Sequence, residues 1–233
     1  MNLNPRQKQV LKAIVEGFVK SSQPIGSNYI VEMLPFSVSS ATIRNDMTQL
    51  SEAGFIEQPH TSAGRIPTDM GYKAYIEMAM LERKELSHRQ QEMLTAHFKR
   101  LRNLQDRFKE AARLLSELSG SVSLLIDDTN KVYMSGLSNL PKLPEFRDAE
   151  FGEDFMELLE DPIARFKKIT RAPDSHPQVV FGSKDFGKTS IVITKFGPQG
   201  RKIISVIGPM RMHYGKTLPA VDYIAKILNE DIR

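Results

Sequence analysis

The sequence predicts an α+β protein. It is expected to have an N-terminal winged helix-turn-helix, long linking helices and a small antiparallel-sheet domain. Three observations support this prediction. From Asn4 to Gly54, apolar residues recur at helical spacing, and two short strand-like segments follow. A longer helical pattern then runs to about Leu118. After Gly120, alternating apolar residues and turn residues predict strands, with helices between them.

We therefore divide the chain into three parts. Residues 1–82 form the predicted winged-helix domain, residues 83–119 a linking or dimerisation helix, and residues 120–233 the C-terminal domain. With 233 residues, the chain is long enough for one or two domains with real cores.

Composition excludes several classes of chemistry. The chain has no cysteine, which rules out disulfides, thiol catalysis and cysteine-ligated zinc. The sequence shows no transmembrane-length apolar run and no apolar signal-peptide core, so we expect a cytoplasmic protein without a membrane partner. The net charge of +4 permits a nucleic-acid partner without requiring one. Residues 83–113 carry a basic surplus, which indicates either phosphate attraction or a solvated helix face.

Two helices are predicted before the helix that is expected to enter the DNA groove. The first begins at Asn4 and Pro5, where proline suits the first helical turn. The second is short, runs from about Ser27 to Met33, and has Ser27 as its expected N-cap. Pro35 stops it, and a turn leads into the third helix.

The third helix has a buried stripe and a small polar face. Ser39 can cap its start, and Gly54 lies just past its end. One face carries three apolar residues at helical spacing. The opposite face is small and polar, as a helix needs to be to enter a DNA major groove. The apolar residues are Ile43, Met47 and Leu50; the polar face comprises Ala41, Asn45 and Thr48, flanked by Arg44 and Gln49.

A wing is predicted directly after this helix. Phe55 to Gln58 and Arg65 to Thr68 read as two strands, joined by a turn over Pro59 to Gly64. Donors at such a tip can hold DNA phosphates. The alternative is a helix packed on a hairpin whose tip is merely polar, and the pattern alone leaves both open. The candidate donors are His60, Thr61, Ser62 and Arg65.

The linking region shows a heptad-like seam. After a helix that Asp69 is expected to cap, Ser87 can cap a stretch that extends to about Leu118. Its seam residues recur at alternating steps of four and three, which fits a helix–helix contact. The seam could close a dimer or lie on the C-terminal domain; we favour the dimer. The seam residues are Leu94, Phe98, Leu101, Gln105, Phe108, Ala112 and Leu115.

The C-terminal part is predicted as a small α+β domain with an antiparallel sheet. A turn at Asp127 and Asp128 joins the first two strands. The predicted strands are 121–126, 131–135, 178–181, 190–196 and 202–207, and the predicted helices are 151–159, 162–170 and 216–231.

No catalytic, cofactor or metal site is predicted. Gly182 to Thr189 matches the phosphate-loop pattern, but the following residues read as a strand, whereas a phosphate loop needs a helix there. Arg211 and His213 could line a ligand pocket, although strand-end positions fit them better. The five histidines form no short-spaced pair that would indicate a metal site: His60, His88, His97, His176 and His213.

Several motifs resemble one family. S-S-A-T-I-R-N-D-M at 39–47 and Q-P-H-T-S-A-G-R-I-P-T-D-M-G-Y at 58–72 resemble the head of HrcA-type heat-inducible transcription repressors. Three later segments are similar to the sensor-domain signatures of that family, whose sensor fold is GAF-like. They are L-L-S-E-L-S-G at 114–120, V-Y-M-S-G-L-S-N-L with P-E-F at 132–146, and G-P-M-R-M-H-Y at 208–214.

The chain resembles a shortened member of that family. The family carries a long segment between the first and second sensor signatures, which holds early strands and an inserted dimerisation domain. Only a few residues separate these signatures here. The sensor domain is therefore expected to be a truncated GAF-like domain.

The resemblance implies a non-enzymatic transcription repressor. It would bind a CIRCE-type inverted repeat of double-stranded DNA as a homodimer, upstream of chaperone operons, with the chaperonin GroEL as a possible partner and release on heat stress. Arg44, Asn45 and Thr48 would read bases. The alternative is a winged-helix regulator of other genes that responds to a metabolite or a nucleotide. Phosphates would be held by Ser39, Ser40, Thr42, His60, Thr61, Ser62 and Arg65.

Overall fold

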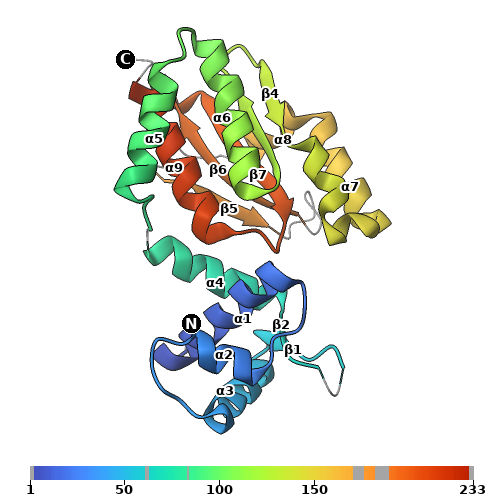
Figure 1. Ribbon diagram of the computed structural model, residues 1–233. Coiled ribbons are helices and arrows are strands. Elements are labelled where there is room, and N and C mark those ends of the chain that lie inside the picture. The colour runs from blue at the N-terminus through green and yellow to red at the C-terminus, as the bar shows by residue number, and fades with distance from the viewer. Residues whose placement is uncertain (1–2, 61–62, 83, 170–175, 182–188, 231–233) are drawn as a thin grey trace. The chain divides into compact units, whose positions relative to one another are not determined.

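A computed structural model describes residues 3–60, 63–82, 84–169, 176–181 and 189–230 (Figure 1). The chain separates into two compact units, Met1–Glu82 and Arg83–Arg233, and each is considered by itself. Among the described residues, no helix is both long enough and apolar enough to cross a membrane.

The first unit is a helical bundle with a small two-stranded sheet (Figure 1). The two strands are antiparallel and pair Ile56 with Pro67 and Glu57 with Ile66. Buried apolar residues from the helices form the core around α1. The elements are α1 (Pro5–Ser21), α2 (Ser27–Met33), α3 (Ser40–Glu52), β1 (Ile56–Glu57), β2 (Ile66–Pro67) and α4 (Asp69–Glu82).

The ends of the helices follow the local chemistry of the sequence, with two exceptions. The side chain of Ser39 accepts a hydrogen bond from the Thr42 amide at 3.1 Å, and Gly54 has a φ of 79° just beyond α3. The prediction that Ser27 caps α2 is wrong, because Gly26 is the N-cap and Ser27 is the first helical residue. The Ser27 hydroxyl bonds the Ser40 hydroxyl instead, at 2.9 Å. The prediction that Asp69 caps α4 is also wrong, because Thr68 Oγ1 accepts a hydrogen bond from the Gly71 amide at 3.1 Å and Asp69 is the first helical residue.

The second unit is built on a five-stranded sheet with the order β4-β3-β7-β6-β5, in which every neighbouring pair is antiparallel. The predicted fold class is confirmed, and the strands and helices predicted after Gly120 occur within a few residues of their expected bounds. The elements are α5 (His88–Lys99), α6 (Leu104–Ser119), β3 (Val122–Ile126), β4 (Val132–Ser135), η1 (Leu137–Lys142), η2 (Pro144–Arg147), α7 (Ala149–Glu160), α8 (Pro162–Ile169), β5 (Gln178–Phe181), β6 (Thr189–Phe196), η3 (Pro198–Gly200), β7 (Lys202–Pro209) and α9 (Tyr214–Glu230).

Helices cover both faces of this sheet (Figure 1). α6 and α9 pack on one face, where the Tyr214 hydroxyl donates to Ser190 Oγ at 2.7 Å and fastens α9 to β6. α7 and α8 pack on the other face, where apolar residues of β3, β6 and β7 form a core with four phenylalanine and leucine side chains. Those four are Phe151, Phe155, Leu158 and Phe166.

Asp127 shapes the turn between β3 and β4. Its carboxylate accepts hydrogen bonds from the amides of Thr129 at 2.8 Å and Lys131 at 2.9 Å, and from the Tyr133 hydroxyl at 3.3 Å. The interpretation of this acidic pair as a turn is confirmed. The second carboxylate, Asp128, pairs with Lys202 at 2.9 Å.

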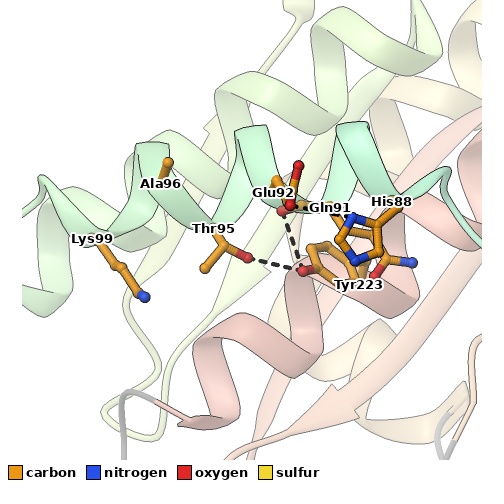
Figure 2. Close-up of a pocket in the computed structure, with 7 residues that line it drawn as sticks. All are labelled: His88, Gln91, Glu92, Thr95, Ala96, Lys99 and Tyr223. Carbon is orange, nitrogen blue, oxygen red and sulfur yellow. Dashed lines mark hydrogen bonds and ion pairs between the residues drawn. The ribbon is translucent and has the colours of Figure 1, made fainter.

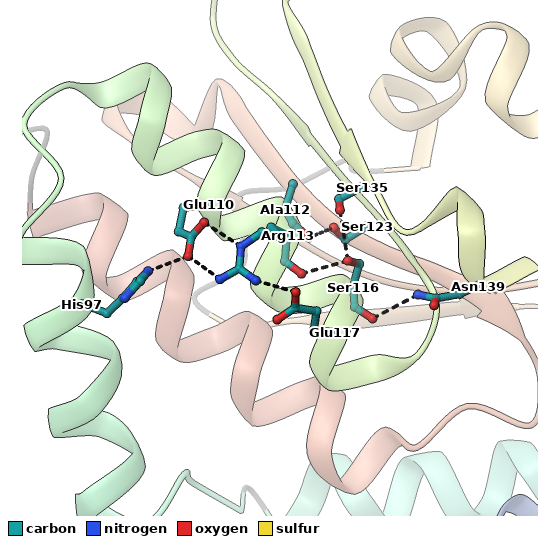
Figure 3. Close-up of polar contacts among 9 residues, drawn as sticks. All are labelled: His97, Glu110, Ala112, Arg113, Ser116, Glu117, Ser123, Ser135 and Asn139. Atoms are coloured by element: carbon teal, nitrogen blue, oxygen red, sulfur yellow. Dashed lines mark hydrogen bonds and ion pairs between the residues drawn. The ribbon is translucent and has the colours of Figure 1, made fainter.

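The single long helix predicted after Ser87 is wrong. α5 ends at Lys99, and α6 begins at Leu104. The break arises because Asn103 caps α6 by accepting a hydrogen bond from the Asp106 amide at 2.8 Å. The two helices are joined side by side by His97, whose Nε2 lies 2.5 Å from Glu110 Oε1 (Figure 3).

The predicted dimer seam is split between α5 and α6, and most of its large apolar residues are buried inside the second unit. Phe98, Phe108, Ala112 and Leu115 are each at most 2% exposed and are buried within the second unit. Ser123 of β3 donates to the Ala112 carbonyl and holds α6 on the sheet (Figure 3). The seam pattern arose because α6 uses Phe108, Ala112 and Leu115 to cover the sheet of its own chain.

Candidate nucleic-acid interface

α3 presents the polar face that its sequence predicts. Arg44, Asn45 and Thr48 are exposed. The buried stripe on the other side is 0% exposed at Ile43 and Leu50. Thr48 Oγ1 donates to the Arg44 carbonyl at 3.0 Å, so the hydroxyl is held against the helix backbone. The face is therefore small, polar and projected away from the core, which is what insertion into a major groove requires.

The start of α3 carries a group of hydroxyls. Ser39 Oγ and Thr42 Oγ1 lie 2.8 Å apart at the helix N-terminus, where backbone N–H groups and the helix dipole favour an anion. Ser40 Oγ donates to Asn28 Oδ1 at 3.2 Å. The sequence predicts that Ser39, Ser40 and Thr42 hold phosphates; the fold joins the hydroxyls of Ser39 and Thr42, whereas that of Ser40 contacts α2.

Two further residues join this group from α2. Ser27 Oγ lies 2.9 Å from Ser40 Oγ and accepts from Arg44 Nε at 3.4 Å. Asn28 bonds Ser40, as described above. Sequence reasoning missed both residues, because the contacts depend on the packing of α2 against α3 and no local motif marks them.

The wing is the hairpin that connects β1 and β2. Its tip is closed by a hydrogen bond from the Ala63 amide to the His60 carbonyl at 2.9 Å, and Gln58 Nε2 donates to the Ala63 carbonyl at 2.9 Å. His60 is exposed near the tip. Thr61 and Ser62 lie outside the described residues.

Arg65 lies at the base of the wing and not at its tip, which corrects the predicted placement. Its backbone pairs with Ile25 through hydrogen bonds of 2.8 and 2.9 Å. A Cβ on Gly64 would lie well under 3.0 Å from the Ile25 backbone, so the close approach requires glycine. Arg65 is half-buried, and its Nε is buried without a hydrogen-bond partner among the described residues.

An ion pair between a buried carboxylate and a half-exposed arginine lies beside the exposed face of α3. Asp46 is 1% exposed, and its carboxylate accepts from Arg6 Nε at 2.6 Å and from Arg6 Nη2 at 3.1 Å. The hydrogen bond to Asp46 raises the pKa of Arg6. Sequence reasoning missed the pair because Asp46 sits at the edge of the apolar stripe and its partner is 40 residues away.

In the second unit, two sensor signatures are joined by an ion pair. Arg211 Nε lies 2.7 Å from Glu145 Oε1, and its Nη2 donates to Glu145 Oε2 at 3.2 Å. The pair is largely shielded from solvent, with side-chain exposures of 14% and 27%. Arg211 follows the end of β7, so its strand-end placement is confirmed.

A shallow groove of about 320 Å³ lies between α5 and α9 (Figure 2). The Tyr223 hydroxyl lies 2.9 Å from Thr95 Oγ1 and donates to the Gln91 carbonyl at 3.2 Å. These bonds fasten α9 to α5, and we interpret the groove as a by-product of that contact. The lining residues are His88, Gln91, Glu92, Thr95, Ala96, Lys99 and Tyr223.

The phosphate-loop pattern is not followed by a helix. Residues 182–188 lie outside the described residues, and Thr189 begins β6, which runs to Phe196. The predicted strand after the loop is therefore confirmed, and a nucleotide-binding helix N-terminus is missing at its required position. Among the described residues, no three His, Asp or Glu side chains gather closely enough to hold a metal ion.

Two family models match this chain and together span most of it. The model described as winged helix-turn-helix transcription repressor, HrcA DNA-binding, matches residues 2–81. The model described as HrcA protein C terminal domain matches residues 65–218.

Curated relatives agree with these models. The heat-inducible transcription repressor HrcA of Desulfitobacterium hafniense is 24% identical, and the match covers 99% of this chain and 98% of the relative. That alignment has 339 positions although this chain has 233 residues, so the relative carries segments without a counterpart here. The HrcA of Symbiobacterium thermophilum is 45% identical over 116 residues, which are 49% of this chain and 34% of the relative.

A solved structure shares the fold. It is the crystal structure of a protein described as hypothetical, with a TM-score of 0.73 and 21% identity. The match covers 98% of this chain and 97% of that one. At this identity the likeness concerns the fold alone.

Proposed function

The chain belongs to the HrcA family of heat-inducible transcription repressors, and from this premise we propose that it represses chaperone operons by binding an inverted-repeat operator. The observation that carries the proposal is the polar face of α3. Three exposed side chains lie opposite a fully buried stripe, in the unit that the HrcA DNA-binding model matches: Arg44, Asn45 and Thr48.

The polar face supplies base readout. In the major groove, an arginine can donate two hydrogen bonds to guanine, and an asparagine can pair with adenine through its amide. We assign these roles to Arg44 and Asn45, with Thr48 beside them. A threonine methyl group can also contact thymine.

Phosphate contacts position the helix in the groove. We assign them to the hydroxyls of Ser39, Ser40 and Thr42 at the α3 N-terminus and to the wing. His60 is the exposed wing donor among the described residues. Thr61 and Ser62 are assigned here from sequence alone. Arg65 would act from the base of the wing.

A homodimer would present two such heads to the two halves of a CIRCE-type repeat. The relative of Desulfitobacterium hafniense has segments that this chain lacks, and the seam on α6 is buried. The dimer would therefore use another surface of the chain. Because its partner is chromosomal DNA, we place the protein in the cytoplasm.

Release on heating would follow from marginal stability. Domains of this size are stable by about 5–15 kcal/mol, so a few kcal/mol decide whether the repressor is folded. The chaperonin GroEL would set the folded fraction by assisting refolding, and heat would divert it to other clients. Transcription of the chaperone genes would then rise.

The test is a binding titration with two duplexes, one carrying the inverted repeat from the organism's own chaperone promoter and one with that sequence scrambled. Wild-type protein is expected to prefer the operator. Arg44→Ala should lower operator affinity by about 5-fold to 150-fold and bring it close to the scrambled value. Lys20→Ala, at the far end of α1, removes the same charge and should leave the preference intact.

Footprinting on those promoters would locate the two half-sites. If wild-type protein binds both duplexes equally at modest salt, the proposed function is wrong. Equal losses on both duplexes for Arg44→Ala would show that this side chain contacts the backbone and does not read bases.

A further inference from the structure

Two side chains in the first turn of α1 form hydrogen bonds with one side of α3. Arg6 holds the Asp46 carboxylate with two hydrogen bonds, at 2.6 and 3.1 Å. The adjacent Gln7 donates from Nε2 to Gln49 Oε1 at 2.8 Å. Asp46 and Gln49 are three residues apart on α3, so consecutive residues of one helix fix neighbouring positions on the other.

A capping box holds the first turn of α1 in place. Asn4 Oδ1 accepts from the Gln7 amide at 2.9 Å, and Gln7 Oε1 accepts from the Asn4 amide at 3.0 Å, which forms a capping box. Gln7 therefore serves the cap and the contact with Gln49 together. The anchor for α3 is a rigid helix start.

We propose that the Arg6–Asp46 pair sets the rotation of α3 about its own axis and so aims Arg44, Asn45 and Thr48 at the bases. The proposal deepens the proposed function and rests on it. Asp46 is a positioning residue, because its carboxylate is buried and cannot reach DNA.

Burial of the apolar stripe alone cannot fix the rotation of α3 this closely. Burial of Ile43, Met47 and Leu50 favours an inward stripe, but the hydrophobic effect has no direction. A forked guanidinium–carboxylate pair has a fixed geometry. A rotation of roughly 20° would move an atom about 6 Å from the helix axis by about 2 Å, which is enough to lose a base contact.

The charge of Asp46 makes the proposal separable from plain electrostatics. Removing a carboxylate near DNA should favour binding to every duplex, because the phosphates are negative. A changed rotation of α3 should instead weaken binding to the operator duplex alone, because only operator binding depends on base contacts. The two explanations predict opposite signs for operator binding.

The experiment compares Asp46→Asn with Glu82→Gln on operator and scrambled duplexes. Glu82 pairs with Lys12 of α1 at 2.8 Å, so the control also changes one carboxylate to an amide and breaks an ion pair with α1. Asp46→Asn should lower the operator-over-scrambled ratio about 10-fold, while scrambled binding stays level or rises. Glu82→Gln should leave the ratio unchanged.

Arg6→Lys keeps the positive charge without the fork and should also lower the ratio. If circular dichroism and thermal melting show that Asp46→Asn does not fold, the ratio measured for Arg6→Lys tests the proposal instead. An unchanged ratio in the folded variant, or a rise on both duplexes, would overturn the proposal. If wild-type protein shows no operator preference, the proposed function fails first, and this outcome is distinct.

Discussion

Gly71 and Gly152 permit a matched test of how the winged-helix unit is packed. Both lie in the first turns of helices, α4 and α7 respectively. A Cβ on Gly71 would lie well under 3.0 Å from the carbonyl oxygen of Phe55, whereas a Cβ on Gly152 would meet nothing within 4 Å. The same substitution, glycine to alanine, should therefore have opposite effects in the two units.

The magnitudes follow from two competing effects. Alanine in place of a helical glycine stabilises by about 0.5–1 kcal/mol, and that gain is all that Gly152→Ala should show. At Gly71, α4 and the Phe55 carbonyl must separate until the contact reaches about 3.4 Å, and strain of this kind costs about 1–3 kcal/mol. The net loss, about 1 kcal/mol at the middle of these ranges, would lower the melting temperature of the first unit by roughly 4–8 °C.

The assay is thermal unfolding monitored separately for the two units, together with operator binding against temperature. Gly71→Ala should melt the first unit early and release the operator at a lower temperature. Gly152→Ala should raise the second transition by a few degrees and leave operator binding at 25 °C unchanged. Equal melting of both variants and wild type would refute the close approach of α4 to Phe55.

Further outcomes can be checked with the same protein. Arg65→Ala should weaken operator and scrambled duplexes alike and flatten the salt dependence, as measured by titration at several salt concentrations. The hydrogen bond from Arg113 lowers the pKa of Glu110 from 4.5 to about 2, so its stabilisation is complete above pH 4.5 and is lost as the pH falls toward 2. Glu110→Gln should therefore reduce the pH dependence of the urea unfolding midpoint between pH 4.5 and pH 2. Arg211→Met removes the ion-pair partner of the largely shielded Glu145 carboxylate. It should lower the free energy of unfolding of the second unit by about 2–4 kcal/mol, as measured by urea unfolding. Millimolar ATP or GTP should leave the melting temperature unchanged, because a strand follows residues 182–188.

Local chemistry carried most of the sequence prediction. The stripe of α3, its Ser39 cap and its Gly54 terminus depend on residues a few positions apart, and each was confirmed. The strands of the second unit alternate strongly enough to be recognised individually. The family resemblance was confirmed by the matched models.

Features that depend on distant packing could not be predicted. The seam on α6 had the right spacing for a dimer, but Phe108 and Leu115 cover the sheet of their own chain. The contacts of Asp46 and Ser27 join residues on different helices, so no window of sequence reveals them. The DNA roles of the α3 and wing residues stay predictions until the duplexes are titrated.

The centre of the sheet joins β3 to β7, with Val122 opposite Ile207, although the other three strand pairs, β3–β4, β5–β6 and β6–β7, are local. Formation of that central pairing must close a long stretch of chain, a step that is entropically costly and slows folding. After thermal unfolding, the second unit should therefore regain its native state much later than a small helical head would. A repressor built in this way would resume operator binding only after the sheet had closed, so the recovery of repression would trail the refolding of the winged-helix unit.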